Sequence, residues 1–248
     1  MELTNQANWK KGITLLLIGQ SLTIFASLLA WYAILWYVAI VSQSGLAMTM
    51  LTVAKAVPLF LVSPFAGVWA DRYCKKTLII ISDSFVAVIT MLVAIVFAIG
   101  YEYIVFLLLT NVARGIGQGI LTPAYMSIIP AIVPKDNLVK VNGFSQSVQA
   151  ISQTAAPAVA GLLMAFFPIY KVLLIDVATA IIGVLILVLF VRINKVETET
   201  KNQSAFFQMK EGISYLKESE LVKQIVFFSI VINLVLGPAI FFSTITDY

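Results

Sequence analysis

Two long apolar runs of the chain are joined by the polar bridge Gly67-Val-Trp-Ala-Asp71-Arg72-Tyr-Cys-Lys75-Lys76. A bridge this short predicts that the chain leaves one membrane-spanning helix, turns on one side of the bilayer and begins the next. Gly67, Asp71 and Lys75 recur every four residues, so a helix that persists through Trp69 would place them on one face, where Asp71 could pair with Lys75. Gly67 on that face would let another helix pack closely. The plainer alternative is a basic cytoplasmic turn with a helix cap.

The composition predicts a lipid bilayer as the solvent of this chain. Of 248 residues, 60% are hydrophobic and 11% are charged, and the mean hydropathy is +0.98. These values are typical of polytopic helical membrane proteins. The net charge of +4 does not indicate nucleic-acid binding, because the basic residues are dispersed over loops. With no His and one Cys, the sequence excludes a His/Cys metal site, a Ser-His-Asp triad and an internal disulfide, and we expect no enzyme and no metal.

Seven apolar runs are long enough to cross about 30 Å of hydrocarbon at about 1.5 Å per residue. They are residues 13–40, 46–70, 77–99, 104–122, 145–168, 171–191 and 221–245. The proline-interrupted segment 123–143 is expected to be a cytoplasmic connection. The predicted domains are a six-helix transmembrane bundle over 1–191, a cytoplasmic linker with an amphipathic helix over 192–220, and the first helix of a truncated C-terminal bundle over 221–248.

The distribution of basic residues predicts the orientation of the chain. With the N-terminus inside, thirteen of the sixteen Lys and Arg residues fall in inner segments, and the outer loops hold only Lys171. The positive-inside rule therefore predicts a multi-pass protein of the inner or plasma membrane with a cytoplasmic N-terminus. Four aromatic residues near the far end of the first run are expected to form an interfacial belt: Trp31, Tyr32, Trp36 and Tyr37.

Four charged residues inside the predicted spans are candidates for function, because a charge at membrane depth costs at least a few kcal/mol. Arg114 and Lys55 are expected near the midplane, where Arg114 would tune a carboxylate in a proton pathway and Lys55 would line a cavity. The alternative for Arg114 is a structural pair with Asp83 or with helix-end carbonyls. Asp83 and Asp176 are the carboxylates that could carry a proton, although a structural hydrogen-bonding role is favoured for Asp176.

Uncharged polar residues and glycines complete the set of candidates. Gln20, Asn111, Gln118 and Gln153 lie within or near spans, where they either touch a ligand or hydrogen-bond between helices. The fourth run also carries three glycines that are expected to serve close helix packing: Gly115, Gly117 and Gly119.

The bridge resembles the signature of the major facilitator superfamily, Gly-x-x-x-Asp-Arg-x-x-(Arg/Lys)-(Arg/Lys), and matches it at every fixed position. Further landmarks resemble the macrolide-efflux proteins of the drug:proton antiporter group. They are Gly19-Gln20-Ser21, Asp83, Thr122-Pro-Ala124, Ile129-Pro130, Val133-Pro134, Gly143-Phe-Ser-Gln-Ser147, Ala156-Pro-Ala-Val159 and Ile175-Asp176. A variant of the family's helix-four pattern is Arg114-Gly-Ile-Gly117-Gln118-Gly119. A variant of the helix-five pattern is Ala156-Pro157 with Gly161, and this proline and glycine would bend the fifth helix.

The resemblance implies an all-α membrane fold: a major facilitator-type six-helix N-terminal bundle plus one further transmembrane helix. It implies secondary active efflux of hydrophobic drugs, macrolide-type antibiotics among them, by proton antiport and alternating access. The proton gradient would be the energy source, and no cofactor is expected. The implied conformational gate consists of Gly67, Asp71, Arg72, Lys75, Lys76 and Asp83, and the implied substrate or proton pathway of Arg114, Lys55, Asp176, Gln20 and Asn111.

The expected partners are the lipid bilayer, a small hydrophobic substrate, and a missing C-terminal half or a second chain. Two alternatives stay open. Lys55 and Arg114 would make this half of the cavity positive, which favours an anionic or amphiphilic cargo such as a siderophore or lysophospholipid. The end of the chain at Tyr248, after a seventh span, favours a non-transporting membrane partner or the remnant of a disrupted gene.

Overall fold

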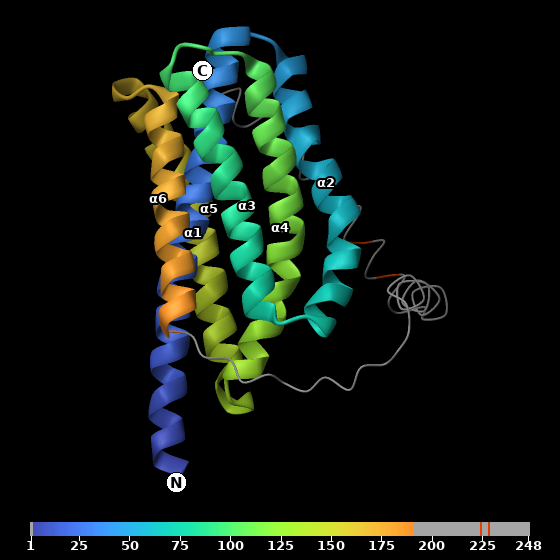
Figure 1. Cartoon of the computed structure of the whole chain (residues 1–248), viewed down its shortest axis with the longest axis vertical. Helices are drawn as coiled ribbons and strands as arrows, with labels where there is room; N and C mark the ends of the chain where they lie inside the picture. The colour runs from blue at the N-terminus through green and yellow to red at the C-terminus, as the bar shows by residue number, and fades with distance from the viewer. Residues whose placement is uncertain (1, 191–223, 225–227, 229–248) are drawn as a thin grey trace. The chain divides into compact units, whose positions relative to one another are not determined.

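The computed structural model describes residues 2–190 and two further positions, 224 and 228 (Figure 1). The chain divides into two units, Met1–Thr200 and Lys201–Tyr248, and the description that follows concerns the first. The predicted linker over 192–220 lies outside the described residues, as does the predicted seventh span over 221–245 apart from those two positions.

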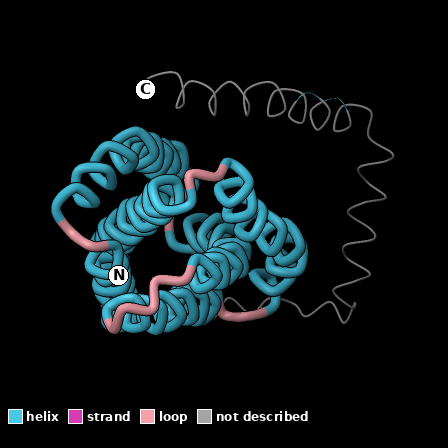
Figure 2. Tube along the Cα trace, turned by 90° about the horizontal axis from the view of Figure 1, so that it is seen from above, coloured by secondary structure: helices cyan, strands magenta, loops and turns pink. Residues whose placement is uncertain are grey.

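The described part of the first unit is built entirely of helices, which stand side by side along one long axis (Figure 1) and are joined at their ends by short loops (Figure 2). All six long helices are long and apolar enough to cross a membrane, which confirms the predicted six-helix bundle. They are α1 (Glu2–Ser42), α2 (Gly45–Arg72), α3 (Lys75–Ala98), α4 (Ile104–Ile132), α5 (Leu138–Phe166) and α6 (Ile169–Phe190), with a short 3-10 helix η1 (Lys135–Asn137) before α5.

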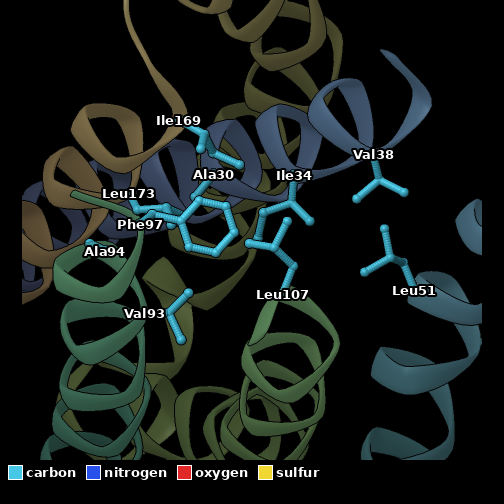
Figure 3. Packing of buried hydrophobic residues seen from close by; sticks show 10 residues of the cluster. All are labelled: Ala30, Ile34, Val38, Leu51, Val93, Ala94, Phe97, Leu107, Ile169 and Leu173. Carbon is cyan, nitrogen blue, oxygen red and sulfur yellow. The ribbon is translucent and has the colours of Figure 1, made fainter. Parts of the chain in front are cut away.

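The core of the described bundle contains three apolar clusters, and a polar level separates the two larger ones. One cluster gathers side chains from five helices: the Phe97 ring lies beside Ala30 and Leu173, and Ile34 faces Leu107 (Figure 3). The other lies towards the opposite ends of α1, α3, α4 and α6 and includes Ile13, Leu16, Ile79, Ile128, Ile129 and Leu187. Between these two clusters, α3, α4 and α6 carry most of the buried polar residues of the described chain: Ser82, Thr90, Thr110, Asn111, Arg114 and Asp176. The two larger clusters therefore enclose the candidate site from both ends.

Glycines let α4 approach its neighbours closely, as the sequence predicts. A Cβ added at Gly115 would overlap the backbone carbonyl oxygen of Lys55, and one added at Gly119 would lie 3.1 Å from the Leu59 carbonyl oxygen. Both glycines face α2 at a spacing of four residues, whereas Gly117 faces Val86 of α3. Small residues four apart allow backbone contact between membrane helices, where van der Waals packing drives association.

Gly115→Ala is expected to lower the free energy of unfolding by about 1–3 kcal/mol, because the backbones of α2 and α4 must separate to admit the new Cβ. Gly143→Ala is the matched control, since a Cβ there has nothing within 4 Å and alanine favours the helix by up to about 1 kcal/mol. Denaturation of the purified chain in detergent measures both changes. An equal loss at the two positions would contradict the packing described for α4.

The bridge differs from its predicted geometry at one point. The helix α2 ends at Arg72, the Tyr73 N–H donates to the Trp69 carbonyl oxygen at 2.8 Å, and an extended Cys74 precedes α3, which begins at Lys75. The prediction that Lys75 shares a helix face with Gly67 and Asp71 is therefore wrong, because the chain must reverse direction between two neighbouring helices and a continuous helix cannot do so.

Gly67 and Asp71 do lie on one helix, α2. A Cβ added at Gly67 has nothing within 4 Å, so the close helix contact expected there is not made by any part of the chain that the structure describes. The side chain of Asp71 lies outside the described part.

The predicted boundary between the fourth and fifth helices is also wrong. The segment 123–143 is not a connection, since α4 continues through Pro123 and Pro130 to Ile132 and α5 starts at Leu138. Prolines are tolerated inside membrane helices because neighbouring groups can satisfy the freed backbone carbonyls. At 29 residues and about 1.5 Å per residue, α4 spans roughly 43 Å and exceeds the hydrocarbon thickness. The first membrane span begins at Gly12, in agreement with the predicted start at residue 13, although the helix itself begins at Glu2 and its start projects beyond the other helices (Figure 1).

Candidate functional site

A cavity of about 560 Å³ lies within the bundle, at the level between the two larger apolar clusters. Most of its wall comes from α1, α3, α4 and α5, while α2 contributes Lys55 and α6 contributes Asp176 and Ala180. Its charged lining residues are Lys55, Asp83, Arg114 and Asp176. The four charged candidates of the sequence, from four different helices, therefore meet in one place.

A buried ion pair fixes one end of this group. Nη2 of Arg114 lies 2.5 Å from Oδ2 of Asp176, and the two side chains are 3% and 5% exposed. The guanidinium also donates to the Ser27 hydroxyl at 3.1 Å and to the Thr90 hydroxyl at 3.4 Å. The partner of Arg114 is thus Asp176, and the alternative of a pair with Asp83 or helix-end carbonyls is wrong. One side chain ties α4 to α1, α3 and α6.

Lys55 has an aromatic neighbour that the sequence did not indicate. Its ammonium lies 4.5 Å from the centre of the Trp31 ring, a cation–π contact that holds the charge beside the cavity. Trp31 is therefore turned into the bundle, where the sequence predicted an interfacial belt. Farther along α1, Tyr37 donates to Glu102 at 2.8 Å and packs edge-on against Phe97.

Asp83 lies in the cavity wall without an ion-pair partner among the described residues. Tyr125, which is 8% exposed, lines the same cavity from α4 and was not singled out in the sequence. Three buried atoms of the lining residues have no hydrogen-bond partner in residues 2–190: Gln20 Oε1, Ser82 Oγ and Arg114 Nε. Because an unsatisfied buried polar group costs about 1–3 kcal/mol, this wall favours water or a polar ligand in the cavity.

The α5 wall is a stripe of uncharged polar side chains, of which only Gln153 was predicted as a candidate for ligand contact. The amide stripe consists of Asn142, Ser145, Gln146, Gln149 and Gln153. Its helical spacing could have been recognised in the sequence, but Asn142 fell within the segment 123–143 that was predicted to be a connection.

The remaining candidates lie away from the cavity. In the predicted gate, Arg72 is exposed, Lys75 is partly buried and the Lys76 ammonium donates to the Val188 carbonyl oxygen of α6 at 3.0 Å. Asp83 lies seven residues along α3 from Lys76, about 10 Å at the helical rise. A gating role for these residues stays a prediction.

Asn111 and the helix-five motif are also outside the cavity wall. Asn111 is fully buried on α4, and neither atom of its amide has a partner in the described part of the chain. Ala156 is fully buried, Pro157 lies inside α5, and Gly161 packs against the Trp36 ring of α1. This motif therefore sits at the contact between α5 and α1.

In the described part of the chain, six membrane-length helices surround a polar cavity with a buried ion pair and form a multi-pass membrane bundle. The chain belongs to the major facilitator superfamily, in the family described as transmembrane secretion effector, whose model matches residues 11–240.

The chain is similar to two curated proteins in sequence and to one solved structure in fold. Macrolide efflux protein A of Streptococcus pyogenes is 31% identical over 216 residues, which cover 86% of this chain and 53% of that protein. Macrolide efflux protein A of Enterococcus faecalis is 34% identical over 166 residues, covering 66% of this chain and 51% of that protein. The chain thus spans about half the length of these relatives.

The fold is shared with a crystal structure of a bacterial homologue of the human lysosomal transporter Spinster, in an inward-facing and occupied conformation. The TM-score is 0.53 at 16% sequence identity, and the match covers 76% of this chain and 46% of that one.

Proposed function

We propose that this chain forms one half of a secondary active exporter that removes hydrophobic drugs, macrolide-type antibiotics among them, by proton antiport. One observation carries the proposal: a polar cavity inside an apolar bundle holds a carboxylate, Asp83, that has no ion-pair partner among the described residues. The likeness to two proteins named macrolide efflux protein A supports the cargo.

In this mechanism the two halves of the exporter rock about the cavity and open it to each side in turn. The Arg114–Asp176 pair keeps α1, α3, α4 and α6 together during the movement, because its hydrogen bonds reach all four. Asp83 takes up a proton from the side of higher proton activity and releases it on the other side, while the drug moves in the opposite direction.

The second wall of the cavity comes from a further six-helix bundle, either a C-terminal half or a second chain. The basic bridge Arg72, Lys75 and Lys76 closes the cytoplasmic gate in one state. The distribution of basic residues supports a cell-membrane location with a cytoplasmic N-terminus.

The cavity wall holds carboxylates beside the two basic residues that led us to expect a positively charged half-cavity. Asp83 and Asp176 line the same wall as Lys55 and Arg114, so the formal charges cancel. The sequence could not show this, because the two carboxylates reach the cavity through helix packing. Charge therefore no longer favours a siderophore or lysophospholipid as cargo, and these become outcomes of the test.

Accumulation of a radiolabelled macrolide in a pump-deficient bacterium tests the proposal. Where a second copy supplies the second wall, expression of residues 1–248 is expected to lower accumulation several-fold, and a protonophore is expected to restore it. Asp71→Asn, in the proposed gate, is expected to remove most of the effect. Unchanged accumulation with the chain present in the membrane would reject macrolide export by this chain, and labelled lysophospholipid and siderophore would then test the other cargoes. No export of any of the three would favour a non-transporting partner.

A further inference from the structure

The amide stripe of α5 presents one continuous polar face to the cavity. Its residues are spaced three, one, three and four apart, so they fall on one side of a helix with 3.6 residues per turn. Four of the five carry a carboxamide, and α5 has the lowest mean hydropathy of the six described spans, 1.3. Because polar side chains are costly in contact with lipid, a membrane helix with a continuous polar face has a polar partner for that face.

Nothing in the described part of the chain is that partner. Asn142, Gln146, Gln149 and Gln153 are exposed, and their amides make no hydrogen bond with the described residues. By contrast, two hydroxyl residues of α5 outside the cavity wall satisfy themselves. Ser147 donates to the Gly143 carbonyl oxygen at 2.9 Å, and Thr154 donates to the Ala150 carbonyl oxygen at 3.0 Å.

Hydrogen-bonding groups approach the same cavity from other helices. Gln20 Oε1 on α1 and Ser82 Oγ on α3 are buried lining atoms that lack a partner in residues 2–190. Since a carboxamide both donates and accepts, it matches hydroxyl and carbonyl oxygens alike. The charges of the wall cancel, so these neutral groups are the ones left to discriminate between ligands.

We propose that the amide stripe is the specificity-determining surface of the cavity and binds the hydroxyl- and carbonyl-rich face of the cargo, as found on a glycoside. The apolar body of the cargo lies against the aliphatic lining, which includes Ile24, Leu28 and Val86. The inference rests on the proposed function, since it describes how the same cavity selects its substrate. A cargo without these oxygens leaves amides unpaired, and a site built for hydrogen bonds rejects such an analogue.

A double-mutant cycle in binding affinity, with one change in the protein and one in the ligand, tests this inference. The full chain in lipid nanodiscs is titrated with a radiolabelled macrolide and with the same macrolide acetylated on its sugar hydroxyls. The protein variant is Gln149→Met with Gln153→Met, which keeps side-chain length and removes both amides. The control, Thr154→Val, lies on the same helix outside the cavity wall and loses a hydroxyl that bonds to its own backbone.

Acetylation is expected to weaken binding to the natural sequence about tenfold, and the double variant is expected to bind the unmodified macrolide about tenfold less tightly, since two hydrogen bonds are lost. Acetylation should then have little further effect on the double variant, and the control should bind both ligands like the natural sequence.

Two results would overturn the inference, and they are distinguishable. If the double variant binds like the natural sequence, or shows the same acetylation effect, the stripe does not select the cargo while the proposed function stands. If the natural sequence binds neither ligand, the proposed function fails for macrolides and the inference fails with it. Gln146→Met, measured alongside, decides the matter if the double variant does not fold.

Discussion

Asp176→Leu is expected to lower the free energy of unfolding by about 3–5 kcal/mol, because it leaves the Arg114 guanidinium buried without its counter-charge. The Arg114 side chain is 3% exposed, so its charge depends on Asp176 for most of its compensation. The hydroxyls of Ser27 and Thr90 would remain as neutral acceptors, which do not compensate a full charge. Chemical denaturation of the purified chain in one detergent measures the change.

The double variant Arg114→Leu with Asp176→Leu separates charge from packing. Replacing both partners of a buried ion pair by apolar residues is often neutral or stabilising, so most of the stability lost in Asp176→Leu is expected to return. Lys171→Leu, an exposed residue near the start of α6, controls for the added apolar side chain. A double variant that is no more stable than Asp176→Leu would contradict the ion-pair explanation.

Asp83→Asn is expected to abolish proton-driven export and to spare exchange of drug across the membrane. The carboxylate of Asp176 is held by Arg114, which leaves Asp83 as the cavity carboxylate with no ion-pair partner in the described chain. An asparagine keeps the shape and polarity of this side chain but cannot take up and release a proton. Efflux from proteoliposomes with and without an imposed proton gradient measures the two activities.

Asp136→Asn is the control, because Asp136 is exposed in η1 and lies outside the cavity wall. It is expected to retain both activities. Gradient-driven efflux by Asp83→Asn at the natural rate would show that the proton is carried elsewhere.

Much of the fold could be predicted from local sequence. The apolar runs predicted all six described helices, because the length of a membrane helix follows from the thickness of the bilayer. Gly115 and Gly119 predicted a close contact, although the sequence could not name α2 as the partner. The limits of α4 and α5 were misjudged because Pro123 and Pro130 are breakers in water and tolerated in membrane helices.

The candidate site could be predicted as a set of residues but not as an arrangement. Arg114 and Asp176 are 62 positions apart, and their pairing depends on the order and rotation of α4 and α6, which hydropathy does not determine. The contact of Lys55 with Trp31 depends on packing in the same way. The amide stripe is different, since its spacing within α5 was present in the sequence.

Thiol labelling tests most directly whether this bundle encloses a water-filled cavity within the membrane. The sole cysteine, Cys74, is exposed and must first be replaced by serine. Partial burial acts to raise the pKa of its thiol, but hydrogen bonds from Thr77 and Lys76 and the Lys76 charge outweigh burial and lower the pKa, which favours reaction.

Two single-cysteine variants of that background, Gln149→Cys in the cavity wall and Ile151→Cys on the apolar outer face of α5, are then treated with a membrane-impermeant maleimide in membranes opened by freeze–thaw. We predict rapid modification of the Gln149→Cys variant and little modification of the Ile151→Cys variant, whose position is covered by lipid or by a second bundle. Equal labelling of both variants, or protection of the Gln149→Cys variant alone, would contradict the cavity on which the proposed export depends.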